Sequence, residues 1–298
     1  MENQFSKIIL GTVQLGMSYG VGRWANELMP ENEAFRILDA AWEMGITTLD
    51  TSPDYGLAEM RVAKYMKANP AKCFQIISKI KNVSLDSKDD DCWFKDWLSH
   101  CSFLSLHNCA SISILLHREQ TIQDLRVCGI LSEAVVSGQI NQWGLSAYGI
   151  DAVSLAAGIT DCKIVQLPFS PINQSFGRNG MLAKLEELEK TVIARSVFAQ
   201  GRLIKLIDEN STDHGVDERM IVELRDFLSV ENLSITDFAV GFALSERGVT
   251  NVVLGADSAD QINSWASAMP IVPGQRMPCS LSKQLRSYDG KLGKPHLW

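Results

Sequence analysis

Four polar residues, Asp50, Tyr55, Lys79 and His117, stand out in the first half of the chain, because each lies at or just after the end of a short apolar run. A carbonyl group that receives a hydride becomes an alkoxide, which must be protonated or stabilised as it forms. Acidic, phenolic, ammonium and imidazole groups together suit that task. The residue types and their positions therefore predict carbonyl reduction, provided that the fold brings them together.

Each of the four residues has a distinct role in this chemistry. Tyr55 would donate the proton, and the ammonium group of Lys79 would lower the tyrosine pKa from its ordinary value of about 10. Asp50 would hold Lys79 and balance its buried charge, and His117 would donate a hydrogen bond that orients the carbonyl oxygen. Taken singly, the same residues are also typical of a helix cap, a packed tyrosine, a surface lysine or a core histidine. The hypothesis rests on their occurring together.

The elements that must position these residues alternate between short β-type runs and helical stretches, a pattern typical of repeated βα units. We expect strands at residues 8–10, 46–50, 74–79, 112–117, 142–146, 164–167, 191–196 and 252–254. We expect helices at residues 31–44, 56–69, 93–106, 124–137, 151–157, 181–190, 218–228, 234–246 and 258–268.

This order of elements predicts an α/β protein with a (β/α)8 TIM barrel, in which parallel strands end at one common mouth. A doubly wound open sheet is the alternative, but no Gly-x-Gly-x-x-Gly turn follows the first strand to support it. We expect one barrel domain over residues 1–298, with a Pro/Gly-rich tail from about residue 270 that crosses a barrel end.

The overall composition argues against several classes of function. A net charge of -7 disfavours nucleic acid as the main partner, because phosphate binding needs a clustered basic surface. Apolar runs fall short of the roughly 20 residues that a membrane helix requires, and the start of the chain lacks a basic and apolar leader. The scattered cysteines contain no Cys-x-x-Cys pair, so we expect reduced thiols and no metal site. These features predict a cytoplasmic protein without a membrane partner, and they leave its oligomeric state open.

Several motifs make the chain resemble the aldo-keto reductase superfamily over nearly its whole length. Residues 45–56, Gly-Ile-Thr-Thr-Leu-Asp-Thr-Ser-Pro-Asp-Tyr-Gly, followed by Glu59, are similar to the first signature of that family. Ser78-Lys79 and Leu115-Leu116-His117 are similar to its next two catalytic motifs. The resemblance implies a TIM barrel that binds NADPH in extended form and reduces aldehydes or ketones through Tyr55.

Further matches to the family imply where the cofactor binds. Ser146 and Gln166 correspond to residues that contact the nicotinamide carboxamide, the run 196–203 resembles the pyrophosphate loop, and the run 251–258 with Gln261 resembles the adenosine-phosphate motif. The cofactor-binding residues implied in this way are Ser146, Gln166, Ser196, Phe198, Gly201, Arg202, Gly255, Ala256, Asp257, Ser258, Gln261 and Trp265.

The chain departs from the family pattern at three of these places. Ala147 replaces a common asparagine after Ser146, Trp265 stands where an adenine-contacting asparagine is frequent, and Asp257 lies where many relatives carry a cation. A carboxylate beside the 2'-phosphate of NADPH would repel it. We nevertheless expect NADPH as the cofactor, because the resemblance to the family implies it. The carboxylate of Asp257 makes NADH possible.

The substrate is expected to be a small carbonyl compound bound between the loops at the mouth. Tyr19, Trp24 and Phe169 are the candidate substrate-binding residues, and Trp298 in the tail is a further aromatic candidate. Aromatic side chains at these points are typical either of pocket walls or of lids. Aldehydes, sugars and ketosugars all remain open.

Two alternatives keep the fold and change the function. The altered residues Ala147, Asp257 and Trp265 would suit a specialised biosynthetic reductase acting on a keto-sugar or similar intermediate. A non-catalytic scaffold that senses nucleotide is the third hypothesis, although a sensor would not need the Tyr55 and Lys79 pair.

Overall fold

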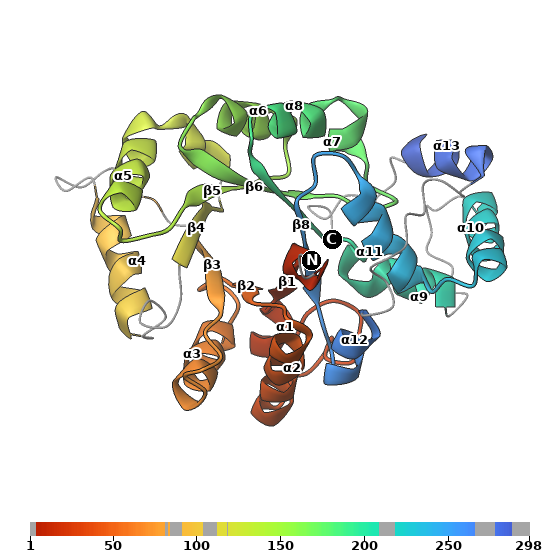
Figure 1. The fold of residues 1–298 in the computed structure, drawn as a ribbon, viewed down its shortest axis with the longest axis horizontal. Helices are drawn as coiled ribbons and strands as arrows, with labels where there is room; N and C mark the ends of the chain where they lie inside the picture. Colours follow the sequence, from red (N-terminus) through yellow and green to blue (C-terminus); the bar gives the residue numbers. More distant parts are fainter. Residues whose placement is uncertain are drawn as a thin grey trace.

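A closed barrel of parallel strands forms the centre of the molecule (Figure 1). The computed structural model describes residues 4–80, 83, 91–103, 112–117, 119–208, 218–265 and 278–287. Within these residues eight strands pair in chain order, and β1 closes the barrel against β8. The strands are β1 (Ile8–Gly11), β2 (Thr48–Asp50), β3 (Gln75–Ile80), β4 (Ile112–Leu116), β5 (Trp143–Ser146), β6 (Cys162–Pro168), β7 (Thr191–Arg195) and β8 (Asn251–Gly255). The predicted (β/α)8 barrel is confirmed.

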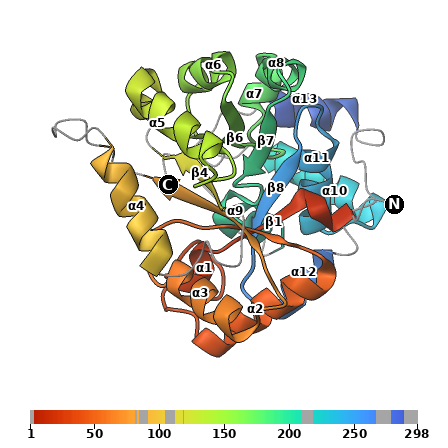
Figure 2. The same cartoon turned by 60° about the vertical axis from the view of Figure 1, so that its left-hand side comes forward.

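Helices surround the barrel, as the view turned by 60° also shows (Figure 2). The helices are α1 (Val13–Gly16), α2 (Glu31–Met44), α3 (Ala58–Ala68), α4 (Cys92–Phe103), α5 (Leu125–Val136), α6 (Ile150–Gly158), α7 (Ser175–Arg178), α8 (Met181–Glu187), α9 (Arg202–Asp208), α10 (Glu218–Glu231), α11 (Ile235–Ser245), α12 (Ala259–Ser264) and α13 (Cys279–Ser287). Single 3-10 turns occur at η1 (Gln4–Lys7), η3 (Glu119–Gln123) and η4 (Ala199–Gly201).

Helix α2 shows why the local sequence folds as it does. Pro30 precedes it, and acidic Glu31 and Glu33 occupy its first turn, where the helix dipole favours negative charge. Gly45 ends it at a φ of 88°, a left-handed conformation that glycine adopts without strain, and strand β2 follows within a few residues.

The core has two layers. The outer layer lies between strands and helices and includes Leu10, Leu49 and Trp143. The inner layer fills the barrel interior with one apolar side chain from each of six strands. Its members are Ile9, Ile77, Leu115, Ile164, Ile193 and the partly buried Val253. Because side chains alternate along a strand, the residue two places after each member points inward again, toward the mouth.

The described part of the tail forms a helix that was not expected. Residues 278–287 contain helix α13, which packs against α10 on the outside of the barrel, where Gln284 donates a hydrogen bond to Glu223 at 2.9 Å (Figure 1). Leu281 and Leu285, one turn apart, are both fully buried. Helix α12 ends at Ser264, earlier than expected, and residues 266–268 and Trp298 lie outside the described part of the chain. Helix α9 was not expected either, and only its first two residues, 202 and 203, belong to the expected phosphate loop.

Among the described residues, no single helix is both long and apolar enough to cross a membrane. Helices α10 and α11 pass that test of length and composition only as a pair, and they meet at an angle of 93°. Buried side chains of both helices belong to the outer layer of the core.

Candidate active site

Eight residues, one from each strand or from the position just after it, form a ring at the carboxyl end of the barrel. All eight line one cavity. We call them the mouth ring: Gly11, Asp50, Lys79, His117, Ser146, Gln166, Arg195 and Gly255. Six of them follow an inner-layer residue by two positions, so the strand pleat itself aims them at the cavity. The convergence of Asp50, Lys79 and His117 expected from the sequence is what the structure shows.

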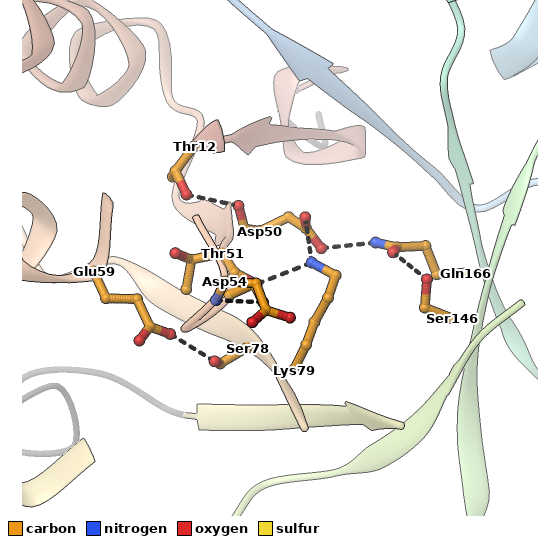
Figure 3. A network of polar contacts seen from close by, with 10 residues as sticks. Thr12, Asp50, Thr51, Asp54, Glu59, Ser78, Lys79, Ser146 and Gln166 are labelled. Carbon is orange, nitrogen blue, oxygen red and sulfur yellow. Dashed lines mark hydrogen bonds and ion pairs between the residues drawn. The ribbon is translucent and has the colours of Figure 1, made fainter. Parts of the chain in front are cut away.

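A continuous hydrogen-bond network joins four members of the ring (Figure 3). Lys79 Nζ donates to Asp50 Oδ1 at 2.7 Å and to the carbonyl of Thr51 at 2.9 Å. The second Asp50 oxygen accepts from Gln166 Nε2 at 2.7 Å, and Gln166 Oε1 accepts from Ser146 Oγ at 3.0 Å. All these side chains are buried. The carboxylate of Asp50 therefore fixes both the ammonium group and the orientation of the amide.

Tyr55 approaches the same ammonium group from the loop after β2. Lys79 Nζ lies 4.9 Å from the centre of the Tyr55 ring, and each of the two groups shifts the pKa of the other. Two glycines let this loop pack closely: a Cβ at Gly16 would lie 1.9 Å from the carbonyl oxygen of Tyr55, and Gly56 has a φ of 57°. Leu57 N donates to Gly16 O at 2.9 Å. Close contact between α1 and this loop thus seats Tyr55.

Burial dominates the acid-base properties of this pair. The pKa of Tyr55 is raised, because desolvation outweighs the nearby charge of Lys79, which acts in the opposite direction. The expectation that Lys79 would give the tyrosine a lowered pKa is therefore wrong for the net shift. For Lys79, burial acts to lower the pKa, but Asp50 and Tyr55 together raise it. At neutral pH the site holds a protonated phenol beside a charged ammonium group.

A second buried contact anchors the strand that carries Lys79. Ser78 Oγ donates to Glu59 Oε1 at 2.7 Å, and Glu59 Oε2 lies 2.7 Å from His100 Nε2 (Figure 3 shows Ser78 and Glu59). Glu59 is on α3 and His100 on α4. These contacts join two outer helices to β3 behind the mouth ring.

The cavity has a volume of about 510 Å³ and brings together most of the expected site residues. Those that line it are Asp50, Tyr55, Lys79, His117, Ser146, Gln166, Ser196, Phe198, Gly201, Gly255, Asp257, Gln261, Trp265 and Tyr19. Arg202, Ala256, Ser258, Trp24 and Phe169 are not part of its described lining. Phe169 stacks on Phe242 in the core, with ring centres 5.9 Å apart, and Ser258 caps α12.

The loop after β7 has an unusual backbone. Ser196, Ala199 and Gln200 have φ values of 58°, 50° and 58°, in the left-handed region that non-glycine residues seldom adopt, and Gly201 follows at 86°. Each such non-glycine residue costs on the order of 1 kcal/mol or more, and such strain gathers at functional sites. Turns of this kind can bind an anion through backbone N–H groups. In this loop Ala199 N and Gly201 N already donate internally, to Ser196 O at 2.9 Å and to Phe198 O at 3.0 Å.

Residues 19–24, which we call the strap, join the loops after β7 and β8 along one side of the cavity. Val21 N donates to Gln200 O at 3.2 Å, Arg23 N to Asp257 Oδ2 at 3.2 Å, and Trp24 Nε1 to Asp257 O at 2.8 Å. The side chain of Trp24 is consequently buried, and it holds the end of the strap against the loop after β8. Asp257 thus has a structural use that the sequence did not suggest, and burial raises the pKa of its carboxyl group.

Tyr19, at the start of the strap, does line the cavity. Burial and the proximity of Tyr55 raise its pKa, and a hydrogen bond with Gln200 partly opposes this. Tyr19 and Tyr55 thus line the same cavity.

The residues that line the cavity are of types that suit an extended nicotinamide cofactor. At one end the Ser146 and Gln166 pair offers a hydroxyl and an amide beside Lys79, and at the other lie Asp257, Gln261 and Trp265. Gly255 makes room for the side chain of Gln14, since a Cβ there would lie 2.4 Å from Gln14 Oε1. That same oxygen is enclosed without a hydrogen-bond partner among the described residues. A bound polar molecule could satisfy it.

Sequence reasoning missed several lining residues, notably Gly11, Tyr148 and Arg195, and it included Gln200 only as part of the run 196–203. Arg195 ends β7 two residues after the inner-layer Ile193, so the alternation of side chains was a usable signal. Tyr148 and Gln200 lie in loops, where no such periodicity applies.

Comparison with known proteins gives a consistent result. A model of the Aldo/keto reductase family matches residues 7–275. An uncharacterized oxidoreductase of Schizosaccharomyces pombe is 22% identical over 294 residues, which cover 87% of this chain and 85% of that protein.

Solved structures give the same fold. An aldo-keto reductase from Bacillus halodurans (holo form) has a TM-score of 0.72 at 19% identity, covering 98% of this chain and 93% of the other. An aldo-keto reductase from Klebsiella pneumoniae in complex with NADPH has a TM-score of 0.68 at 17% identity, covering 95% and 90%. At such identities, the likeness to these two structures shows only that the barrel fold is shared.

Proposed function

The chain belongs to the aldo/keto reductase family, and from this premise we propose that it reduces an aldehyde or ketone to an alcohol with Tyr55 as the general acid. The family match agrees with the resemblance found in the sequence, and it makes the protein an oxidoreductase that uses a nicotinamide cofactor. The observation that carries the proposal is the contact of Tyr55 with the buried Lys79 ammonium group, which Asp50 holds at 2.7 Å.

The bound cofactor supplies the hydride that reaches the carbonyl carbon. As the carbonyl π bond breaks and the oxygen becomes negative, Tyr55 transfers its hydroxyl proton to that oxygen and completes the alcohol. Lys79 then faces a phenolate, whose charge it stabilises until solvent returns the proton. Asp50 keeps Lys79 charged and in place throughout, and His117, also on the cavity, donates a hydrogen bond that orients the carbonyl oxygen.

Three groups of residues would hold the cofactor. Ser146 and Gln166 suit the carboxamide, the backbone of the loop after β7 suits the phosphates, and Asp257, Gln261 and Trp265 suit the adenosine end. We propose NADPH, with NADH also accepted because Asp257 brings a negative charge to that end. The Klebsiella pneumoniae protein of the same fold was crystallised with NADPH.

Substitution of the proposed acid tests the mechanism. We expect Tyr55→Phe to lower kcat for a panel of aldehydes and ketosugars by about 1,000-fold or more, since general acid catalysis and phenolate stabilisation are both lost. The affinity for the reduced cofactor, measured by quenching of protein fluorescence, should change little. Tyr65→Phe is the matched control, because Tyr65 is a buried tyrosine on α3 that does not line the described cavity.

Unchanged turnover in Tyr55→Phe would refute the role of the acid. If the wild-type protein binds cofactor but reduces nothing in the panel, the hypothesis of a nucleotide-sensing scaffold becomes the better one.

A further inference from the structure

Arg195 is the one member of the mouth ring that is a cation without an acidic partner among the described residues. It ends β7 and points inward with the other ring members. Lys79, the other cation of the ring, is paired with Asp50 at 2.7 Å. The ion pairs found in the described chain do not include Arg195.

The contacts of Arg195 orient its guanidinium group without neutralising it. Nη2 donates to the carbonyl oxygen of Ala147 at 3.1 Å, and the guanidinium carbon lies 4.0 Å from the centre of the Tyr148 ring. Nε is enclosed and has no hydrogen-bond partner among the described residues. A stacked, half-buried guanidinium with unused donors is a typical receptor for a planar anion.

The acidic residues of the described cavity lining do not supply that anion. Asp50 is already bonded to Lys79 and Gln166, and Asp257 accepts from the backbone of Arg23 in the strap. The positive charge of Arg195 is therefore available to a bound molecule.

Arg195 also lies on the side of the cavity where the proposed chemistry takes place. Its charge acts to lower the pKa of both Tyr55 and Tyr19, although burial raises both overall. Its contacts, Ala147 and Tyr148, follow the proposed carboxamide contact Ser146 directly. The residues proposed for the adenosine end, by contrast, lie after β8.

We propose that Arg195 binds a carboxylate of the substrate, so that the protein prefers aldehydes or ketones that carry an acidic group. This inference rests on the proposed reductase function and deepens it. The carboxylate would pair with the guanidinium group while the carbonyl oxygen of the same molecule reaches Tyr55. Arg195 would then determine specificity and position the substrate, whereas the proton still comes from Tyr55.

A pair of substrates that differ only in charge tests the proposal. We expect wild-type protein to reduce 4-carboxybenzaldehyde with a kcat/KM about 10- to 100-fold above that for its methyl ester, the range of a charge-assisted hydrogen bond. Arg195→Gln should remove most of this preference by raising KM for the acid, while the ester stays within about twofold. Arg195→Lys should keep part of it, because the charge remains and the planar fork is lost.

Controls separate a local effect from a general one. Arg36→Gln on the exposed face of α2 removes the same charge far from the cavity lining and should leave the acid-to-ester ratio unchanged. A binding arm that needs no turnover compares benzoate with benzamide, titrated against the protein with and without reduced cofactor. Benzoate should bind more tightly, and only while Arg195 is present.

Each contrary result has its own meaning. If the wild type reduces the ester at least as well as the acid, the inference fails and the reductase function stands. Equal losses on both substrates in Arg195→Gln also overturn it, and a matching loss of NADPH affinity would assign the anion to a cofactor phosphate. If neither substrate is reduced, the proposed function is in doubt, and the binding arm alone decides: equal affinities for benzoate and benzamide overturn the inference.

Discussion

Lys79 is an ammonium group at 2% exposure, and its position explains the arrangement of the residues around it. Removing one partner of a buried ion pair costs about 3–5 kcal/mol, whereas replacing both partners by apolar groups is often neutral. An apolar pair would therefore serve stability as well as Asp50 and Lys79 do. The presence of the charged pair beside Tyr55 is better explained by chemistry than by folding.

The raised pKa of Tyr55 predicts opposite pH dependences for the two directions of reaction. Reduction needs the protonated phenol, which persists below the pKa, so kcat/KM should stay flat from neutral pH to beyond about pH 9 and fall only at higher pH. Oxidation of the alcohol needs the phenolate, so its rate should rise about tenfold per pH unit over the same range. Lys79 remains charged throughout, because its pKa is raised as well.

Steady-state rates of reduction and of oxidation, each measured as a function of pH, test this prediction. Loss of reduction as the pH rises through neutrality would contradict the shift of Tyr55. Lys79→Met should move the oxidation limb further into alkaline pH, because the charge that lowers the tyrosine pKa is gone.

The carboxylate of Asp257 leads us to expect at most a weak preference between NADPH and NADH. Its charge should make NADPH bind no more tightly than NADH in the wild type. Asp257→Asn keeps an oxygen acceptor for Arg23 and removes the charge, so the NADPH-to-NADH affinity ratio should rise about fivefold to tenfold. Fluorescence titration with both cofactors gives the ratio. Asp260→Asn, an exposed charge loss on α12, should leave it unaltered, and a hundredfold wild-type preference for NADPH would contradict the argument.

At the scale of elements, Tyr55 is placed by close packing of backbone against backbone. The loop carrying Tyr55 lies between β2 and α3, and α1 presses against it at Gly16. The loop after β7, by contrast, is held by the strap through Val21 and Gln200. Loops that bear function are thus fastened to neighbouring elements.

A methyl group at Gly16 should displace the Tyr55 loop. A Cβ would lie 1.9 Å from Tyr55 O and 2.3 Å from Ala58 N, so the backbone must move. We expect Gly16→Ala to destabilise the protein by about 1–3 kcal/mol and to lower kcat at least tenfold, with cofactor affinity largely retained. Thermal unfolding and steady-state kinetics measure the two effects.

Gly129→Ala on α5 is the control, because a Cβ there meets no atom within 4 Å and a helical alanine is favoured by about 1 kcal/mol. Full activity and an unchanged Tm in Gly16→Ala would show that the loop does not depend on this contact.

At the scale of the whole molecule, the sequence predicted the barrel well, because alternating strands and amphipathic helices are local patterns. It also predicted the convergence of Asp50, Lys79 and His117, since parallel strands must end at one mouth. Helix α13 was missed because the Pro/Gly-rich composition around it outweighed the spacing of Leu281 and Leu285. The prediction of a lowered pKa for Tyr55 was wrong for the net shift, because the burial that raises this pKa is a property of the assembled fold.

Loop paths account for most of the other differences. Trp24 and Phe169 were expected as substrate-binding residues, yet one anchors the strap and the other packs in the core. Their contacts, Asp257 and Phe242, are distant in sequence, so no local pattern could reveal them. The assigned roles of the cavity residues stay predictions until the variants are measured.

The mouth ring takes one member from every strand, and neighbouring members belong to separate βα segments of the chain. Asp50, Lys79, Gln166 and Ser146 depend on one another through their hydrogen bonds, whereas the contacts of Arg195 lie outside that network. Arg195 on β7 can be varied while Tyr55, Lys79 and Asp50 remain. The protein could in this way acquire a new substrate by a single codon change without rebuilding its reaction.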